Sequence, residues 1–289
     1  MIKEPLSTNQ ENFDGTADAM DIPDADPCQT SLRKDAHMHS DVYAVRSYEV
    51  DACGRLSISA LCNFMQDAAG KHADELGVSV AQLQKESKTW MLSRLALQMK
   101  VYPGWQETFH VTTWPSGSRR LFALRDFLFH DSQNRLLGSA ATAWLVIDTK
   151  YRRPVRIEPF LKKLNPGAHG SETIFEPNLF EKIPKFSDYS HEIRFRIRYQ
   201  DLDTNRHVNN VSFIEWIVES IPAEELQCSM LTGLEIHYMA EAFHGDFVIS
   251  KSRPLDGQSG TFLHRIVKED SGQELIRART AWKRNDHER

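Results

Sequence analysis

The chain contains two copies of one sequence pattern, and this internal repeat constrains its fold more than any other feature. A strand-like string, ATAW in one copy and RTAW in the other, follows a run of polar turn residues each time. Two further matches precede it in the same order, which is typical of a duplicated unit. The matched pairs are Tyr48–Asp51 with Arg198–Asp201, Gly104 with Gly245, and Ala141–Trp144 with Arg279–Trp282. The offset falls from 150 to 138 along the chain, so the second copy is slightly shorter.

Both copies predict the same order of elements: one strand, one long helix and four further strands. In the first copy, Ser57 can cap the helix and Gly77 suits its end. The predicted strands of this copy are 43–50, 91–101, 106–115, 119–130 and 135–147. The second copy has a strand at 191–199, a helix near 209–221 and four more strand-like runs. One long helix with five antiparallel strands, occurring twice, predicts an α+β fold in which each helix lies against one face of a curved sheet.

The repeat and the composition divide the chain into four expected parts. Residues 1–37 are poor in large apolar side chains, and we expect a disordered acidic tail. Residues 1–36 hold eight acidic and three basic residues, which accounts for the whole net charge of −5. We expect an N-terminal domain at 38–150 and a C-terminal domain at 191–289. Five prolines between 151 and 190 indicate a linker.

Composition excludes several classes of protein. No apolar stretch approaches the roughly 20 residues of a membrane helix. The first residues have neither an apolar signal core nor an arginine-rich pattern, so secretion and organelle import are not indicated. The four cysteines form no CxxC pair, which argues against a zinc module and fits a reducing cytoplasm. Outside the tail, acidic and basic residues balance, which gives no sign of a nucleic-acid partner.

The string DLDTNRHVNN is the most informative candidate for a site. It places Asp203, Asn205 and His207 just before an apolar helix, whose first turn offers free N–H groups and a partial positive charge. A carboxylate can hold a histidine in one tautomer, and an amide can orient a water or a substrate oxygen. The alternative is that these residues only form a turn and a helix cap. A calcium loop does not fit, because its sixth position is Arg206 rather than glycine and its twelfth is Ser212 rather than glutamate.

Glu241 is the second candidate. If residues 236–243 form a strand, alternation places Glu241 on the same face as Met239 and Phe243. A partly buried carboxylate between large apolar side chains suits a general base. The alternative is an exposed strand end.

Comparison of the two copies favours the functional interpretation of both candidates. By the offsets above, the first copy has Cys53, Arg55 and Ser57 in place of Asp203, Asn205 and His207, and Lys100 in place of Glu241. A scaffold would need the same polar groups twice. We therefore expect the second copy to carry the chemistry and the first to bind substrate.

The first copy offers candidate substrate-binding residues at the start of one strand. Trp90, Met91 and Arg94 are expected either to pack in the core or to line a ligand pocket. Basic residues cluster at Arg119–Arg120 and along 150–163, where they form either a solvated face or a docking surface for an acidic partner. The chain has no GxSxG, GxGxxG or P-loop motif.

The sequence resembles the acyl-acyl carrier protein thioesterases, plant plastid enzymes with bacterial relatives. The resemblance rests on TWMLSRLALQMKVYPGW, TTWPSGSRR and ATAW in the first copy, and on YQDLDTNRHVNNVSFIEWIVES and HYMAEA in the second. It implies two hot-dog units in tandem, each a long helix wrapped by an antiparallel sheet. It also implies that Asp203, Asn205, His207 and Glu241 are catalytic. The plant enzymes often have a cysteine after the glutamate, and Ala242 occupies that position here, which makes a cysteine nucleophile implausible.

The resemblance implies hydrolysis of fatty acyl thioesters on acyl carrier protein, releasing free fatty acid. We expect a cytoplasmic enzyme that needs no metal or organic cofactor, has the carrier protein as its partner, and is a monomer or a homodimer. One alternative is an acyl-CoA thioesterase, which would share every catalytic residue. Another is an acyl-binding or regulatory hot-dog protein without turnover. A hot-dog dehydratase is a third, although it should not need Asn205 together with Glu241.

Overall fold

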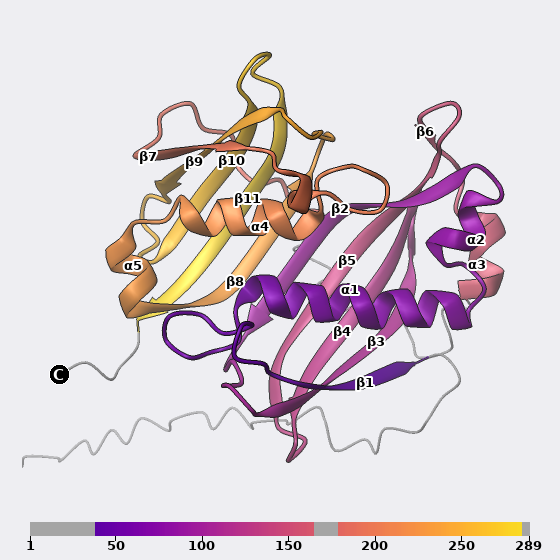
Figure 1. Ribbon diagram of the computed structural model, residues 1–289, viewed down its shortest axis with the longest axis horizontal. Helices are drawn as coiled ribbons and strands as arrows, with labels where there is room; N and C mark the ends of the chain where they lie inside the picture. The colour runs from indigo at the N-terminus through magenta and orange to yellow at the C-terminus, as the bar shows by residue number, and fades with distance from the viewer. Residues whose placement is uncertain (1–37, 165–178, 285–289) are drawn as a thin grey trace, which may run out of the picture. The chain divides into compact units, whose positions relative to one another are not determined.

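A computed structural model of the protein describes residues 38–164 and 179–284 (Figure 1). The chain divides into two units, Met1–Asp35 and Ala36–Arg289, and the described residues all belong to the second. The acidic tail expected at 1–37 lies outside the described residues. Within this part of the chain no helix is both long and apolar enough to cross a membrane.

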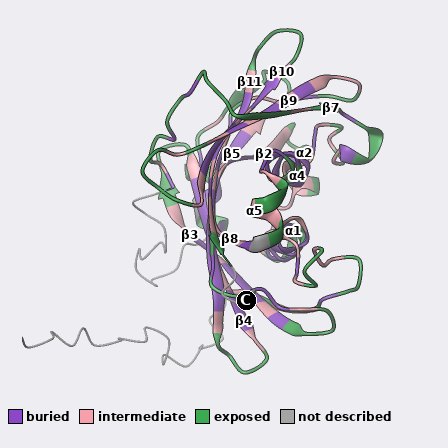
Figure 2. Cartoon of the chain, turned by 90° about the vertical axis from the view of Figure 1, so that its left-hand side faces the viewer, coloured by how far each residue is buried: buried purple, intermediate pink, exposed green. Residues whose placement is uncertain are grey.

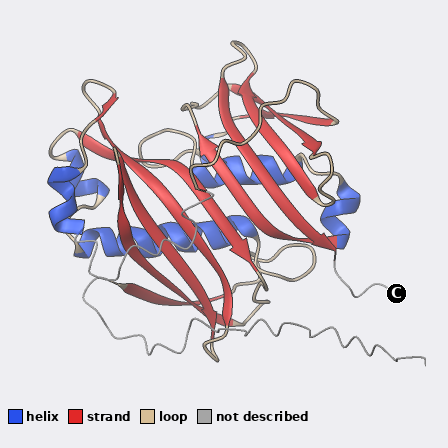
Figure 3. Cartoon of the chain, turned by 180° about the vertical axis from the view of Figure 1, so that it is seen from behind, coloured by secondary structure: helices blue, strands red, loops and turns tan. Residues whose placement is uncertain are grey.

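One continuous antiparallel sheet of 11 strands organises the described residues, in the order β1-β3-β4-β5-β2-β8-β11-β10-β9-β7, with β6 paired to β5 (Figures 1 and 3). The first copy contributes β1 (His39–Ala44), β2 (Lys88–Met99), β3 (Thr108–Arg119), β4 (Phe122–Asp131), β5 (Leu136–Asp148) and β6 (Arg153–Pro154). The second copy contributes β7 (His191–Arg196), β8 (Ser229–Tyr238), β9 (Phe247–Pro254), β10 (Thr261–Lys268) and β11 (Glu274–Arg284). The predicted strand at 43–50 is shifted, because the chain leaves the sheet after Ala44.

The two long helices lie on the same face of this sheet (Figure 2). They are α1 (Ile58–Glu75) and α4 (Asn210–Glu219), and the shorter helices are α2 (Val80–Gln84), α3 (Glu158–Leu164) and α5 (Ala223–Cys228), with a 3-10 helix at Tyr199–Asp201. Ser57 caps α1 as predicted, since its Oγ accepts from the Ala60 N–H at 3.2 Å. Asn209 caps α4 in the same way through the Val211 N–H. The tandem α+β hot-dog plan is therefore confirmed.

Strand alternation separates the two faces of the sheet. Leu95 and Leu97 of β2 face the helices and join the main core, whereas Ala96 between them belongs to a separate cluster on the other face. Residues 179–186 of the expected linker pack against that other face, where Leu179 contacts the Ala96 cluster. Residues 158–164 of the same segment form α3 and close the end of the first copy beside α2.

The pairing of β2 with β8 joins the two copies. Arg94 lies opposite His237 at one end of this ladder, and Gln98 lies opposite Gly233 at the other. With an offset of 139 residues between the copies, Arg94 corresponds to Gly233 and Gln98 corresponds to His237. The second pair is therefore the first pair with the two copies exchanged. The copies are thus related by a pseudo-twofold rotation through the centre of the β2–β8 ladder.

A buried histidine makes folding stability depend on pH. His264 of β10 is fully buried, with Nδ1 3.2 Å from Ser220 Oγ and Nε2 2.8 Å from Thr280 Oγ1. Burial lowers the pKa of His264 from 6.5 to about 3. Between these pH values the unfolded chain binds a proton that the folded chain does not. Stability is therefore lost as pH falls below 6.5.

We expect the free energy of unfolding to fall more steeply between pH 7 and pH 5 in the wild type than in His264→Gln, which has no titrating group there. Urea unfolding at both pH values measures the two slopes. The comparison is between slopes, so a general loss of stability in the variant does not affect it. Equal slopes would show that His264 does not carry the linkage.

Candidate active site

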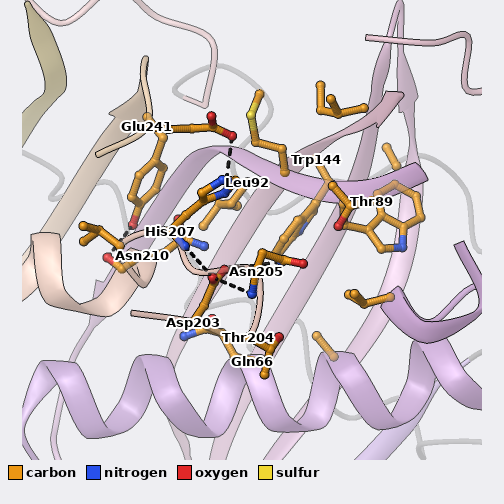
Figure 4. Close-up of a pocket in the computed structure, with 18 of the residues that line it drawn as sticks. Gln66, Thr89, Leu92, Trp144, Asp203, Thr204, Asn205, His207, Asn210 and Glu241 are labelled. Carbon is orange, nitrogen blue, oxygen red and sulfur yellow. Dashed lines mark hydrogen bonds and ion pairs between the residues drawn. The ribbon is translucent and has the colours of Figure 1, made fainter. Parts of the chain in front are cut away.

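The string predicted to carry chemistry forms a tight turn, residues Leu202–Val208, which we call the Asp203 turn. Leu202 and Val208 form an isolated antiparallel bridge, and Arg206 takes a left-handed backbone conformation with φ of 64°. Asp203 Oδ1 accepts from the backbone N–H groups of Asn205 at 2.9 Å and His207 at 3.0 Å. These bonds fix the direction in which both side chains leave the turn (Figure 4).

The first copy contains the same turn at Val50–Leu56, which we call the Asp51 turn. Asp51 Oδ1 accepts from the N–H groups of Cys53 at 2.8 Å and Arg55 at 3.0 Å, and Gly54 has the left-handed backbone. The backbone bond from Asp51 N to Arg55 O matches that from Asp203 N to His207 O.

These contacts correct the sequence alignment by two residues at this point. Asp51 corresponds to Asp203, whereas the sequence comparison placed Cys53 there. Cys53 then corresponds to Asn205, and Arg55 corresponds to His207. The aspartate is common to both copies and serves the turn, so only the amide and the imidazole distinguish the second copy.

A similar correction applies to Glu241. Strand β8 ends at Tyr238, so Glu241 lies in the loop that follows and not on a strand. The backbone of this loop bonds to the Asp203 turn, since Val208 N donates to Ala242 O, and in the first copy Leu56 N donates to Pro103 O. By this match Glu241 corresponds to Tyr102, not to Lys100.

His207 and Glu241 face each other (Figure 4). Nδ1 of His207 lies 3.4 Å from Oε1 of Glu241, and each side chain is about one-third exposed. The rings of His207 and Phe243 pack in a T-shaped arrangement, with centroids 5.3 Å apart. We expected Asp203 to hold the imidazole, but Asp203 reaches His207 through backbone atoms and not through its ring. The carboxylate beside the ring is that of Glu241. Within the described residues, Nε2 of His207 has no hydrogen-bond partner, which leaves it available to a substrate.

Residues of the first copy complete the arrangement, and the sequence did not single them out for this role. Arg152, in the turn between β5 and β6, donates from a terminal nitrogen to Oε2 of Glu241 at 2.9 Å. Gln84 of α2 donates to Oδ1 of Asn205 at 3.2 Å, while Nδ2 of Asn205 faces Asp203 at 3.4 Å. Arg152 appeared in the sequence only as one of a run of basic residues, and Gln84 gave no signal.

A cavity of about 1010 Å³ connects these groups with the interior of the first copy. Asn205, His207 and Glu241 line one part of it, together with Asn210 in the first turn of α4, where backbone N–H groups lack partners within the helix. Mostly apolar side chains of the first copy line another part, among them Ala73, Trp90, Met91, Leu92, Ala123, Leu124, Trp144 and Ile147. The volume lies at the upper end of the roughly 300–1,000 Å³ found for small-molecule sites.

Two of the three predicted binding residues line this cavity. Trp90 and Met91 do, with the Trp90 indole N–H donating to Val78 O at 2.8 Å. Arg94 is not among the lining residues. It lies opposite His237 in the β2–β8 ladder, where burial, followed by the charge of Arg94, lowers the pKa of His237 to about 4. Among the described residues, no three His, Cys, Asp or Glu side chains are grouped closely enough to hold a metal ion.

Comparisons with known proteins show which family the chain matches. Residues 36–163 match the family described as acyl-ACP thioesterase N-terminal domain, and residues 185–284 match the acyl-ACP thioesterase C-terminal domain. The chain is 28% identical over 266 residues to a chloroplastic palmitoyl-acyl carrier protein thioesterase of Cuphea hookeriana. That match covers 88% of this chain but only 64% of the relative's length.

Two solved structures are similar over most of the chain. The 12:0-ACP thioesterase of Umbellularia californica is 25% identical with a TM-score of 0.77, covering 86% of this chain and 98% of that one. An acyl-ACP thioesterase of Bacteroides thetaiotaomicron is 26% identical with a TM-score of 0.69, covering 85% and 98%.

Because both copies contain this turn, the same substitution can be compared in the two copies. Asp203→Ala removes the acceptor of the Asn205 and His207 N–H groups, so both amides should exchange with deuterium about fivefold to tenfold faster, as expected for a loss near 1 kcal/mol. Asp51→Ala should have the same effect on Cys53 and Arg55 only. Hydrogen exchange measured residue by residue tests both. Unchanged protection at Asn205 and His207 would mean that Asp203 does not hold the turn.

Proposed function

Because the chain belongs to the acyl-ACP thioesterase family, we propose that it hydrolyses fatty acyl thioesters of acyl carrier protein to free fatty acid and carrier protein. The observation that carries the proposal is the cavity that joins the His207–Glu241 pair to an apolar chamber. A thioester of a fatty acid needs both parts, since its carbonyl must reach polar groups while its hydrocarbon tail leaves water.

His207 and Glu241 act as one proton-transfer unit. Oε1 of Glu241 lies 3.4 Å from Nδ1 of His207 and favours the tautomer that keeps its proton on Nδ1, so Nε2 is free to take a proton from water. The water oxygen bonds to the thioester carbon, whose carbonyl oxygen becomes an oxyanion. When the intermediate collapses, the carbon–sulfur bond breaks and Nε2 returns the proton to the departing thiolate. Both oxygens of Glu241 already have partners, which favours this role over attack by Glu241 itself.

The remaining groups position the substrate. Backbone N–H groups in the first turn of α4, at Asn210, stabilise the oxyanion together with the partial positive charge of the helix terminus. Asn205 orients the water or the thioester oxygen through its amide, while Asp203 positions the turn. Trp90 and Met91 contact the acyl chain in the chamber. The unit at 38–150 then binds the chain, the unit at 191–289 carries the chemistry, and 151–190 links them.

Two experiments test the proposed reaction at His207 and Glu241. His207→Ala and Glu241→Ala should each lower kcat by about 10²–10⁴, because proton transfer is lost. In a single turnover in ¹⁸O-labelled water, the label should enter only the fatty acid. Mass spectrometry of the peptide containing Glu241 provides the second readout. Label in Glu241 would show that this residue attacks the thioester and would overturn its assignment as the partner of His207.

The carrier protein docks on a basic segment beside the cavity opening. Thr149, Arg152 and Pro154 are exposed and also line the cavity, so the turn between β5 and β6 lies where the cavity meets solvent. The neighbouring Lys150 and Arg153 are exposed and have no ion-pair partner among the described residues. Both cations lie over the ring of Tyr151. Cations without an ion pair at the opening suit an acidic carrier, whose attached acyl thioester must reach the site.

Charge reversal tests the docking surface. Lys150→Glu with Arg153→Glu should raise KM for acyl-carrier substrate, as should added salt, while KM for a short acyl thioester stays unchanged. Arg119→Glu with Arg120→Glu is the matched control, since neither residue lines the cavity. A larger effect of the control pair would move docking to the β3–β4 turn.

Thiol release from acyl-carrier and acyl-CoA substrates of C8 to C18 distinguishes the remaining alternatives. A preference for the carrier supports the proposal, and a preference for CoA assigns the chain as an acyl-CoA thioesterase. A folded protein that binds acyl chains without turnover would be an acyl-binding protein.

The proposed reaction uses only the side chains and backbone of this chain. We place it in the cytoplasm, where the exposed free thiol of Cys53 would stay reduced. Cell fractionation tests that location, and light scattering decides between monomer and homodimer.

A further inference from the structure

We propose that Arg152 of the first copy is the positioning residue for Glu241 in the second, an inference that rests on the function proposed above. A terminal nitrogen of Arg152 lies 2.9 Å from Oε2 of Glu241, while Oε1 of the same carboxylate faces Nδ1 of His207 at 3.4 Å. The carboxylate is thus held between a guanidinium of one copy and an imidazole of the other.

Glu241 needs such a partner because its own loop does little to orient it. Residues 239–246 form no helix or strand, and the Glu241 side chain is 34% exposed. Within the described residues, His207 and Arg152 are the only polar side chains that contact its carboxylate. A carboxylate bound to His207 alone can rotate about its last bond. A second contact from a planar guanidinium restricts that rotation and keeps Oε1 on the imidazole.

The backbone of the first copy places Arg152 for this contact. Asp148 Oδ1 accepts from the N–H groups of Lys150 and Tyr151, both at 2.9 Å, and fixes the turn that follows β5. Arg152 itself has a left-handed backbone with φ of 51°, a conformation that non-glycine residues rarely adopt. Strand β6 then returns along β5, with Arg153 opposite Asp148. Hydrogen bonds to Asp148 hold the backbone before Arg152, and the pairing of β6 with β5 holds the backbone after it. The backbone that carries the guanidinium is therefore fixed.

The chain provides a closely matched control. Arg135, in the turn between β4 and β5, is paired with Asp131 at 2.6 Å and is 76% exposed, compared with 74% for Arg152. Both are exposed arginines of the first copy that hold a carboxylate beside a strand turn, but Arg135 does not line the cavity. Exposed ion pairs contribute little to folding, so neither alanine variant should change the melting temperature appreciably.

The experiment compares Arg152→Ala, Arg152→Lys and Arg135→Ala, first on a short soluble acyl thioester that has no carrier protein and then on an acyl-carrier substrate. We expect Arg152→Ala to lower kcat about 10–100-fold with little change in KM, the loss typical of a misplaced catalytic group. Arg152→Lys should keep an intermediate kcat, and millimolar guanidinium ion should partly restore Arg152→Ala. Arg135→Ala should behave as the wild type. Adding Arg152→Ala to Glu241→Ala should cause no further loss, because the two residues act through one contact.

Two results would overturn the proposal. One is an unchanged kcat in Arg152→Ala. The other is a rise in KM confined to acyl-carrier substrate, which would assign Arg152 to docking instead. Failure of the proposed function is distinguishable from both, since it appears in the wild type itself, either as no thiol release from any acyl thioester or as a preference for acyl-CoA over the carrier substrate.

Discussion

The antiparallel pairing of β2 with β8 is the contact on which the rest of the structure depends. It joins the six strands of the first copy and the five strands of the second into one sheet, and it places α1 and α4 on the same face. As a result, the start of α4 and the Asp203 turn lie beside the interior of the other copy. Neither copy alone contains a site: one provides the imidazole and the carboxylate, and the other provides the apolar chamber and the guanidinium that holds the carboxylate.

The two turns that precede the long helices show how a shared scaffold was specialised. Asp51 and Asp203 make the same backbone contacts, so this carboxylate is a requirement of the turn. The residues that follow it differ, with Arg55 where the second copy has His207. In the first copy Arg55 bonds to Asp51 and to Ser229 O near α5. The position to which we assign chemistry in one copy therefore stabilises the contact between copies in the other.

The sequence predicted the architecture well and the site only in part. Periodicity and turn residues indicated the order of elements in each copy, because alternation and capping are local properties, as Ser57 shows. The exact alignment of two weakly similar copies depends on the geometry of their loops. The sequence comparison therefore matched Cys53 with Asp203, where the structure matches Asp51. Contacts between distant segments leave no local pattern. The approach of Arg152 to Glu241 depends on how β5, β6 and the loop after β8 meet in space. The alternation that placed Glu241 on a strand failed because β8 ends three residues earlier.

The fusion of both copies into one chain changes what a single substitution can do. In a homodimer of identical units, every mutation is made twice, so a residue improved for binding a substrate is altered in the catalytic position as well. In this chain each substitution changes only one of the two copies. Selection can widen or shorten the chamber in the first half without touching the imidazole in the second, at the cost of keeping one site where a symmetric pair would have two.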